Sequence, residues 1–364
     1  RNNLAAGKIG TSSTSFGLAS AGINTAAATT AFGVNALASN TTASGNTAIG
    51  NLALTANTGS VGVSNTAVGS SALATNTSGR FNTAVGSAAL SSNTDAEYNV
   101  GIGSNALRDN TTGDSNIGIG INALLINTIG NNNVAIGLQA LDDNTSGTRN
   151  VAMGSQALGA NIGGIQNVAI GHNASLTSTG SANTALGFEA GRATGGVNNL
   201  TNIGFQAGSS NTGGNSTVVG FQAGNANTGA DAVIIGFQAG GTNAGGRATI
   251  IGSLAGRGNS GQQNTYIGWN AAGLLNNSAC SNNVAVGMNA MNSNAGRVVS
   301  NSTAIGTQAL ENPSSNANNN TAVGYQAGAQ LTSGSNNVMV GNASRITTGS
   351  NSIAIGVGAN AGAF

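Results

Sequence analysis

The residues able to do chemistry are few in this sequence and widely separated. Only nine of the 364 residues are acidic, whereas a glycosidase needs two carboxylates facing one sugar. Asp109 and Asp143 are two repeats apart in the sequence, and we expect roughly 10 Å between them, near the limit for an inverting mechanism. Both lie in Asn-rich segments where acidic residues are ordinary. We therefore predict no catalytic residue and no enzyme activity.

Metal ligands are equally sparse. His172 is the only histidine and Cys280 the only cysteine, so one chain cannot supply two histidine ligands or form an internal disulfide. We interpret His172 as a corner side chain and Cys280 as an incidental small residue in the loop Asn276–Asn283. Because calcium-binding Gly-Gly-x-Gly-x-Asp repeats are also absent, we predict no metal and no cofactor.

Aromatic residues that recur beside glutamine suggest binding chemistry. Between Gly187 and Gly268 the sequence repeats Gly-Phe-Gln-Ala-Gly or a close variant. We single out the aromatic residues at this position as a candidate glycan-contact or packing stripe: Phe188, Phe205, Phe221, Phe237, Trp269 and Tyr325. Rings spaced about 4.8 Å apart can stack on one another. The stripe would either seal a seam between chains or bind sugar rings, and burial of the rings would exclude sugar binding.

An internal repeat must position all of these side chains. The pattern Asn-Thr-Ala-Ile-Gly or a variant returns about every 17 residues. Its glycine, which we call the anchoring glycine, falls at these positions in the regular stretches: Gly86, Gly103, Gly120, Gly137, Gly154, Gly171, and later Gly204, Gly220, Gly236, Gly252, Gly268. Such units are stable only when stacked on neighbours. We predict an all-β parallel β-solenoid of about 21 turns of roughly 16–19 residues. A single continuous repeat domain, residues 13–364, would follow an N-terminal segment or joint, residues 1–12.

The repeat also predicts how each turn is built. Thr83 and Val85 are two residues apart, so they share one face of a strand, and we expect this face to fill the interior. The glycine that follows ends the strand at a corner. Ala89 and Leu90 are expected to form a second inward wall, as a second strand. An Asn-Thr-x-Gly segment then makes the second corner, in which Asn bonds its own chain and Gly supplies positive φ.

A small residue lies between the two large residues of each strand, and we expect it to face outward. Nothing in an exposed β-ladder requires alanine, so a column of small residues predicts a closely packed second copy of the chain. The candidate inter-chain packing column consists of Ala48, Ala67, Ala84, Ala135, Ala152, Ala169, Val218, Ile234 and Ile250.

Two segments resemble known fibre proteins. Asn351–Ala361, which reads Asn-Ser-Ile-Ala-Ile-Gly-Val-Gly-Ala-Asn-Ala, resembles the head repeat of YadA-like trimeric autotransporter adhesins. The longer unit from Asn133 to Gly147 resembles repeats of phage tail fibres. The resemblance covers nearly all of the chain from about Thr30 and implies a left-handed β-roll assembled as a homotrimer. Within these 364 residues we find neither the coiled-coil stalk with heptads and the C-terminal membrane anchor of the adhesins, nor the self-cleaving chaperone domain that often follows such fibres and is removed by its own cleavage.

We therefore expect a structural and adhesive fibre, either a phage tail fibre on a virion or an extracellular cell-surface adhesin. Its expected partners are itself and a host-surface glycan. A net charge of +1 gives no reason to expect nucleic acid. No apolar stretch approaches the roughly 20 residues of a membrane helix, so we expect no membrane insertion.

Two alternatives remain open. In the first, single solenoids polymerise end to end into an extracellular structural filament. In the second, ranks of threonine bind ice or another regular surface. The second is weaker, because the threonine column changes to Val and Ile from Val100 and because we expect it to point into the core.

Overall fold

The computed structural model describes residues 8–9, 13–20, 28–58, 62–273, 275, 280–293, 298–313 and 316–361. The chain divides into two compact units, residues 1–182 and 183–364. Every regular element within the described residues is a β-strand. Of the predicted N-terminal joint, only Lys8 and Ile9 are described, as a strand antiparallel to the next; the rest of residues 1–12 lies outside the described residues.

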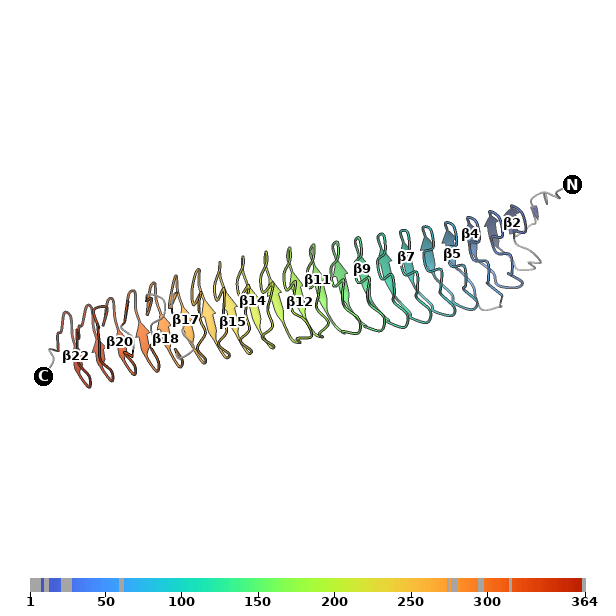
Figure 1. Cartoon of the computed structure of the whole chain (residues 1–364). Coiled ribbons are helices and arrows are strands. Elements are labelled where there is room, and N and C mark those ends of the chain that lie inside the picture. Colours follow the sequence, from blue (N-terminus) through green and yellow to red (C-terminus); the bar gives the residue numbers. More distant parts are fainter. Residues whose placement is uncertain are drawn as a thin grey trace. The chain divides into compact units, whose positions relative to one another are not determined.

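The first unit is a parallel β-solenoid with one short strand per turn (Figure 1). From β2 onward, each strand pairs in parallel with the next. Its strands are β1 (Lys8–Ile9), β2 (Ser13–Phe16), β3 (Thr29–Phe32), β4 (Thr47–Ile49), β5 (Thr66–Val68), β6 (Thr83–Val85), β7 (Val100–Ile102), β8 (Ile117–Ile119), β9 (Val134–Ile136), β10 (Val151–Met153) and β11 (Val168–Ile170).

The second unit is built in the same way. Its strands are β12 (Thr184–Leu186), β13 (Thr201–Ile203), β14 (Thr217–Val219), β15 (Val233–Ile235), β16 (Thr249–Ile251), β17 (Thr265–Ile267), β18 (Val284–Val286), β19 (Thr303–Ile305), β20 (Thr321–Val323), β21 (Val338–Val340) and β22 (Ile353–Ile355). All are parallel to their neighbours within the unit. The predicted all-β parallel solenoid is confirmed, although the described residues form about 19 turns, fewer than the 21 predicted.

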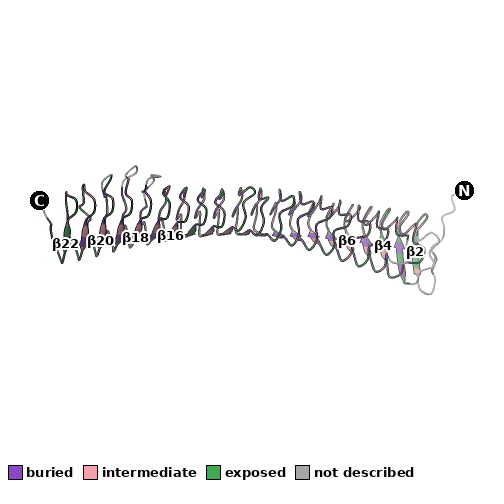
Figure 2. Ribbon diagram, turned by 90° about the horizontal axis from the view of Figure 1, so that it is seen from below, coloured by how far each residue is buried: buried purple, intermediate pink, exposed green. Residues whose placement is uncertain are grey.

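The strands turn the opposite face inward from the one predicted. In the regular turns the middle residue of each strand is buried, while the residues on either side are partly exposed (Figure 2). A Cβ built on Gly101, a middle residue, would lie 3.3 Å from Leu90 Cδ1 of the preceding turn. The middle column therefore faces the leucines of the core, and the β-branched columns face out.

The prediction of an inter-chain packing column is consequently wrong. Each of its members is fully buried by its own chain: Ala48, Ala67, Ala84, Ala135, Ala152, Ala169, Val218, Ile234 and Ile250. The strand period of two identifies which residues share a face, but it does not identify which face is inside. Here the inside is decided by the leucines, which leave room only for a small residue opposite them.

The second wall of each turn is buried as predicted, but it is not a strand. Ala123 and Leu124 are both fully buried. However, Asn122 and Leu124 have φ of 58° and 52°, and a chain that alternates into the left-handed region cannot continue an extended strand. The turns remain bonded there, since the Leu124 N–H donates to the Ala140 carbonyl of the next turn at 3.0 Å.

Core volume is shared between the middle strand residue and the residue six positions later. In the first unit a small residue such as Ala135 is followed by Leu141, and both are buried. In the turns of the second unit that carry Val218, Ile234 and Ile250 the sizes are exchanged, and Ile234 is followed by Gly240. A Cβ on Gly240 would lie 3.0 Å from Ile234 Cγ2 and 3.3 Å from Ile250 Cδ1. The middle column widens, therefore, where the opposite wall loses its leucines.

Two buried ladders of asparagine line the core. In one, the Asn133 N–H donates to Asn116 Oδ1 (3.0 Å), and Asn116 Nδ2 donates to the Gly130 carbonyl (2.7 Å). In the other, at the predicted second corner, Asn127 Nδ2 donates to Asn110 Oδ1 (2.7 Å) and to the Gly130 carbonyl (3.0 Å). The amides thus satisfy one another and the corner backbone, which offsets the cost of burying them.

The anchoring glycines have the backbone that the repeat predicts. Gly220 has φ of 133°, a conformation open essentially to glycine alone. A Cβ there would lie 2.5 Å from the Gly236 carbonyl oxygen of the next turn. The glycine is required both by its own dihedral and by the distance between turns.

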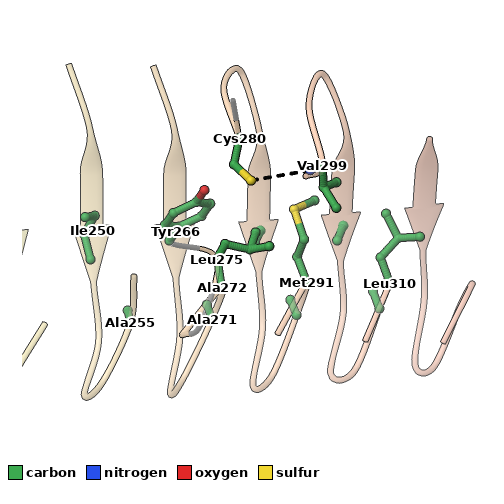
Figure 3. Packing of buried hydrophobic residues seen from close by; sticks show 14 of the residues in the cluster. Ile250, Ala255, Tyr266, Ala271, Ala272, Leu275, Cys280, Met291, Val299 and Leu310 are labelled. Carbon is green, nitrogen blue, oxygen red and sulfur yellow. Dashed lines mark hydrogen bonds between the residues drawn. The ribbon is translucent and has the colours of Figure 1, made fainter. Parts of the chain in front are cut away.

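Cys280 is part of the core rather than incidental to a loop. It is buried, and the Val299 N–H donates to its Sγ at 3.4 Å. Figure 3 shows its side chain directed toward Val299, in the same interior that holds Tyr266 and Met291.

The close approach of turns predicts a specific intolerance at the anchoring position. We expect Gly220→Ala to destabilise the second unit by at least the roughly 1–3 kcal/mol of a strained backbone, with a further steric cost against Gly236. Gly214→Ala is a matched control, because its Cβ would meet Val197 Cγ1 at an ordinary 3.6 Å. Chemical denaturation of both variants measures the difference. Equal stability of the two would contradict the proposed role of the glycine column.

The exchange of core volume predicts a compensating pair. We expect Ile234→Ala to cost about 2–5 kcal/mol through the cavity it leaves. Adding Gly240→Leu should recover part of this loss, because the double variant restores the Ala-plus-Leu arrangement of Ala135 and Leu141. Gly240→Leu alone should destabilise by overpacking against Ile234. A double-mutant cycle measured by denaturation tests the coupling, and simple additivity would refute the exchange.

Candidate functional site

The aromatic stripe lies at the corner that directly follows the anchoring glycines. The rings are partly exposed, from 41% for Phe205 to 50% for Tyr325. Other turns carry different side chains at this corner, for example Ser253 and His172. His172 is thus at the surface corner where the sequence predicted it.

Four of the six rings form one continuous stack. The centroids of Phe188 and Phe205 are 5.3 Å apart, those of Phe205 and Phe221 5.1 Å, and those of Phe221 and Phe237 5.3 Å. Neighbouring planes differ by only 8° to 9°. Trp269 and Tyr325 hold the same corner position in later turns, separated from this stack by turns that carry other residues.

A ladder of glutamines runs alongside the rings. Gln238 Nε2 donates to Gln222 Oε1 (3.1 Å), and Gln222 Nε2 donates to Gln206 Oε1 (2.9 Å). The ladder continues from Gln206 Nε2 to Glu189 Oε2 (2.9 Å). Because each amide fixes the next, the stripe presents a rigid row of polar groups beside a rigid row of rings.

The exposure of the rings leaves sugar binding open but limits how it can occur. Carbohydrate rings stack on aromatic faces, yet the faces of Phe205 and Phe221 are covered by their neighbours in the stack. Only ring edges are accessible along the middle of the row. At the Phe237 end, where no further ring of the described residues stacks, one ring face is accessible.

A surface pocket of about 390 Å³ lies beside the end of the glutamine ladder. Its lining includes Gln238, Thr242 and Arg257, and a volume in this range suits a small ligand. The repeat pattern did not identify this pocket, because the pocket lies where the glutamine ladder stops, at the change from Gln238 to Leu254.

A second, shorter ring stack in the first unit was also missed. Phe81 and Tyr98 stack with centroids 5.2 Å apart and planes 11° apart. Arg80 lies 5.9 Å from the Phe81 ring centroid and forms an ion pair with Glu97 at 2.7 Å. The sequence did contain a signal for this stack, because Phe81 and Tyr98 are separated by one repeat of 17 residues, as are Arg80 and Glu97.

The outward strand columns form an apolar surface. Ile102 and Met153 in the first unit are 38% and 39% exposed, and Leu186 and Ile305 in the second are 44% and 41% exposed. The column two residues earlier is partly exposed as well, as at Thr83. The threonine ranks therefore face out, which removes one of the two grounds against the surface-binding alternative. The other ground, their replacement by Val and Ile, stands.

The acidic residues are spread along the chain, and several of them form ion pairs with arginine. Asp109 accepts two hydrogen bonds from Arg108, at 2.8 and 2.7 Å. Within the described residues, no three His, Cys, Asp or Glu side chains come together in a group able to hold a metal ion. No helix of sufficient length and apolar character to cross a membrane occurs in the described part of the chain.

Asp142 has the one strongly shifted carboxyl among the described residues. Burial raises its pKa from 3.8 to about 6, and the adjacent Asp143 carboxylate adds to the increase. The charged form of Asp142 is thus disfavoured in the folded chain.

No protein-family model matches the chain, and no curated protein has a significantly similar sequence.

The shifted pKa predicts a pH-dependent stability. Because the pKa of Asp142 is higher in the folded chain, stability should fall as the pH rises from about 4 to about 6 and then level off. Asp142→Asn should remove this decline and make the chain more stable than wild type at pH 7. Thermal melts at pH 3 and pH 7 test this. An equal advantage at pH 3, where the wild-type carboxyl is already neutral, would contradict an electrostatic origin.

Proposed function

We propose that this protein is a structural and adhesive fibre protein that associates with copies of itself. The observation that carries the proposal is the outward strand face, whose two columns repeat at every turn. Exposed apolar surface of this extent is characteristic of interaction sites. Its columns consist mostly of the β-branched residues Thr, Val and Ile, which are already restricted at χ1 and so lose little entropy when packed against a partner.

The periodicity of this face favours a second copy as the partner. A partner can contact the same column turn after turn only if its own side chains repeat at the same spacing, about 4.8 Å. A copy of the same chain meets this requirement. The low charge supports close association, because stacked like charges would repel one another at each turn.

The resemblance to trimeric adhesin heads and tail-fibre repeats leads us to propose a homotrimer of left-handed β-rolls. Such a fibre would project from a virion or a cell surface and contact a host, with the exposed aromatic and glutamine stripe as a glycan contact. The end-to-end filament is the alternative.

Self-association predicts a face-specific response to charge. We expect the wild-type chain to have a native mass near three times 34.9 kDa. Ile102→Lys combined with Ile136→Lys places two charges on the strand face and should yield monomers. Ile129→Lys combined with Ile162→Lys is the matched control, since these residues are more exposed but lie at the second corner of the turn, away from the strand face. The control should remain trimeric.

Native mass spectrometry and light scattering measure the outcome, with circular dichroism to check that each variant is folded. A monomeric wild-type chain would refute self-association. Open-ended polymers would favour the filament. Loss of assembly in both pairs of variants would show that the strand face is not the specific interface.

A further inference from the structure

Two side-chain ladders of the second unit end at the same turn. The phenylalanine stack extends as far as Phe237, and the next turn has Ser253 in its place. The glutamine ladder extends as far as Gln238, and the next turn has Leu254 in its place. One turn further on, the aromatic position is filled again by Trp269. The ring column therefore lacks one ring between two aromatic residues.

The backbone keeps these three turns in register. Strands β15, β16 and β17 pair residue for residue. At the corner, the Leu254 N–H donates to the Phe237 carbonyl and the Asn270 N–H donates to the Ser253 carbonyl, both at 2.9 Å. Phe237, Ser253 and Trp269 thus occupy equivalent positions in three successive turns.

This register sets the size of the gap. The stacked rings advance 5.1 to 5.3 Å per turn, so positions two turns apart are about 10 Å apart. A single six-membered ring placed above Ser253 would lie at the spacing of the existing stack from both Phe237 and Trp269. Within the described residues, no ring covers the face of Phe237 on this side.

Polar side chains are present in the turns that border the gap. Gln238 Nε2 donates to Gln222 Oε1, and in the next turn Leu254 stands where an amide could donate to Gln238 Oε1. Arg257, four residues after Ser253, is exposed and lines the pocket of about 390 Å³ together with Gln238 and Thr242. Thr242 Oγ1 donates to the Arg257 carbonyl at 3.1 Å, which holds that part of the pocket wall in place.

We infer that the gap at Ser253 is a binding slot for one pyranose ring of a glycan. A pyranose presents C–H faces that pack on aromatic rings, and hydroxyl groups at its edge that donate to an amide oxygen and accept from a guanidinium. Both requirements meet at this turn. A purely aromatic ligand would fill the ring gap but would leave Gln238 and Arg257 without a role. This inference rests on the proposed glycan contact and places it at one turn of the stripe.

The only tryptophan of the chain lies at the slot and reports its occupancy. The probes are methyl glycosides of glucose, galactose, mannose and N-acetylglucosamine, with phenol as the aromatic comparison. We expect at least one glycoside to shift the Trp269 fluorescence in a saturable manner. Ser253→Phe should complete the stack, leave thermal stability unreduced and weaken glycoside binding about tenfold or more.

Two controls make the result specific. Ser253→Ala keeps the gap open and should retain binding. Ser104→Phe adds the same ring at the same corner of the first unit, far from any aromatic gap, and should also retain binding. Binding that Ser253→Phe does not weaken, a response to phenol alone, or no response to any glycoside would each overturn the slot. Because native mass is measured separately, failure of the slot is distinguishable from failure of the fibre.

Discussion

Successive turns of this protein approach so closely that some positions have no room for a Cβ. At the first corner, a Cβ on Gly137 would lie 2.6 Å from the Gly154 oxygen, and at the second, a Cβ on Gly130 would lie 2.5 Å from the Gly147 oxygen. The same approach brings backbone donors and acceptors within about 2.8 to 3.0 Å over most of each turn. Once two corners of every turn are fixed in this way, each remaining position stacks directly on its counterpart in the next turn.

Stacking of equivalent positions explains the composition. A residue type is acceptable only if it packs against itself, which asparagine does through buried amide ladders and phenylalanine does through its ring faces. Charged residues do not, and they are scarce. The same rule makes the interruptions informative. Within a ladder, each group is used by its neighbour, so groups available to a ligand lie where a ladder stops, as at Ser253.

The interior and the outer strand face divide the apolar residues in an unusual way. Alanine and leucine, or isoleucine and glycine, fill the core, as the pairs Ala135–Leu141 and Ile234–Gly240 show. The residues at the first and third strand positions, most of them β-branched, are placed outside. This surface is poorly suited to water but well suited to an equally periodic partner, which is why the proposed function is argued from this face and not from the core.

How much could be predicted from the sequence differs between backbone and side chains. The period and the anchoring glycines determined the parallel solenoid, its register and its corners. The reason is that the close spacing of successive turns requires the same residue type at the same position of every repeat, and this recurrence is visible in the sequence. The sequence also located the aromatic stripe. It did not decide which strand face is inside, because a period of two is the same for either choice. That was decided by Leu90 and its equivalents, whose left-handed backbone directs them against the middle column. The gap between Phe237 and Trp269 likewise became visible only in the tertiary structure, because its dimensions depend on how three turns stack.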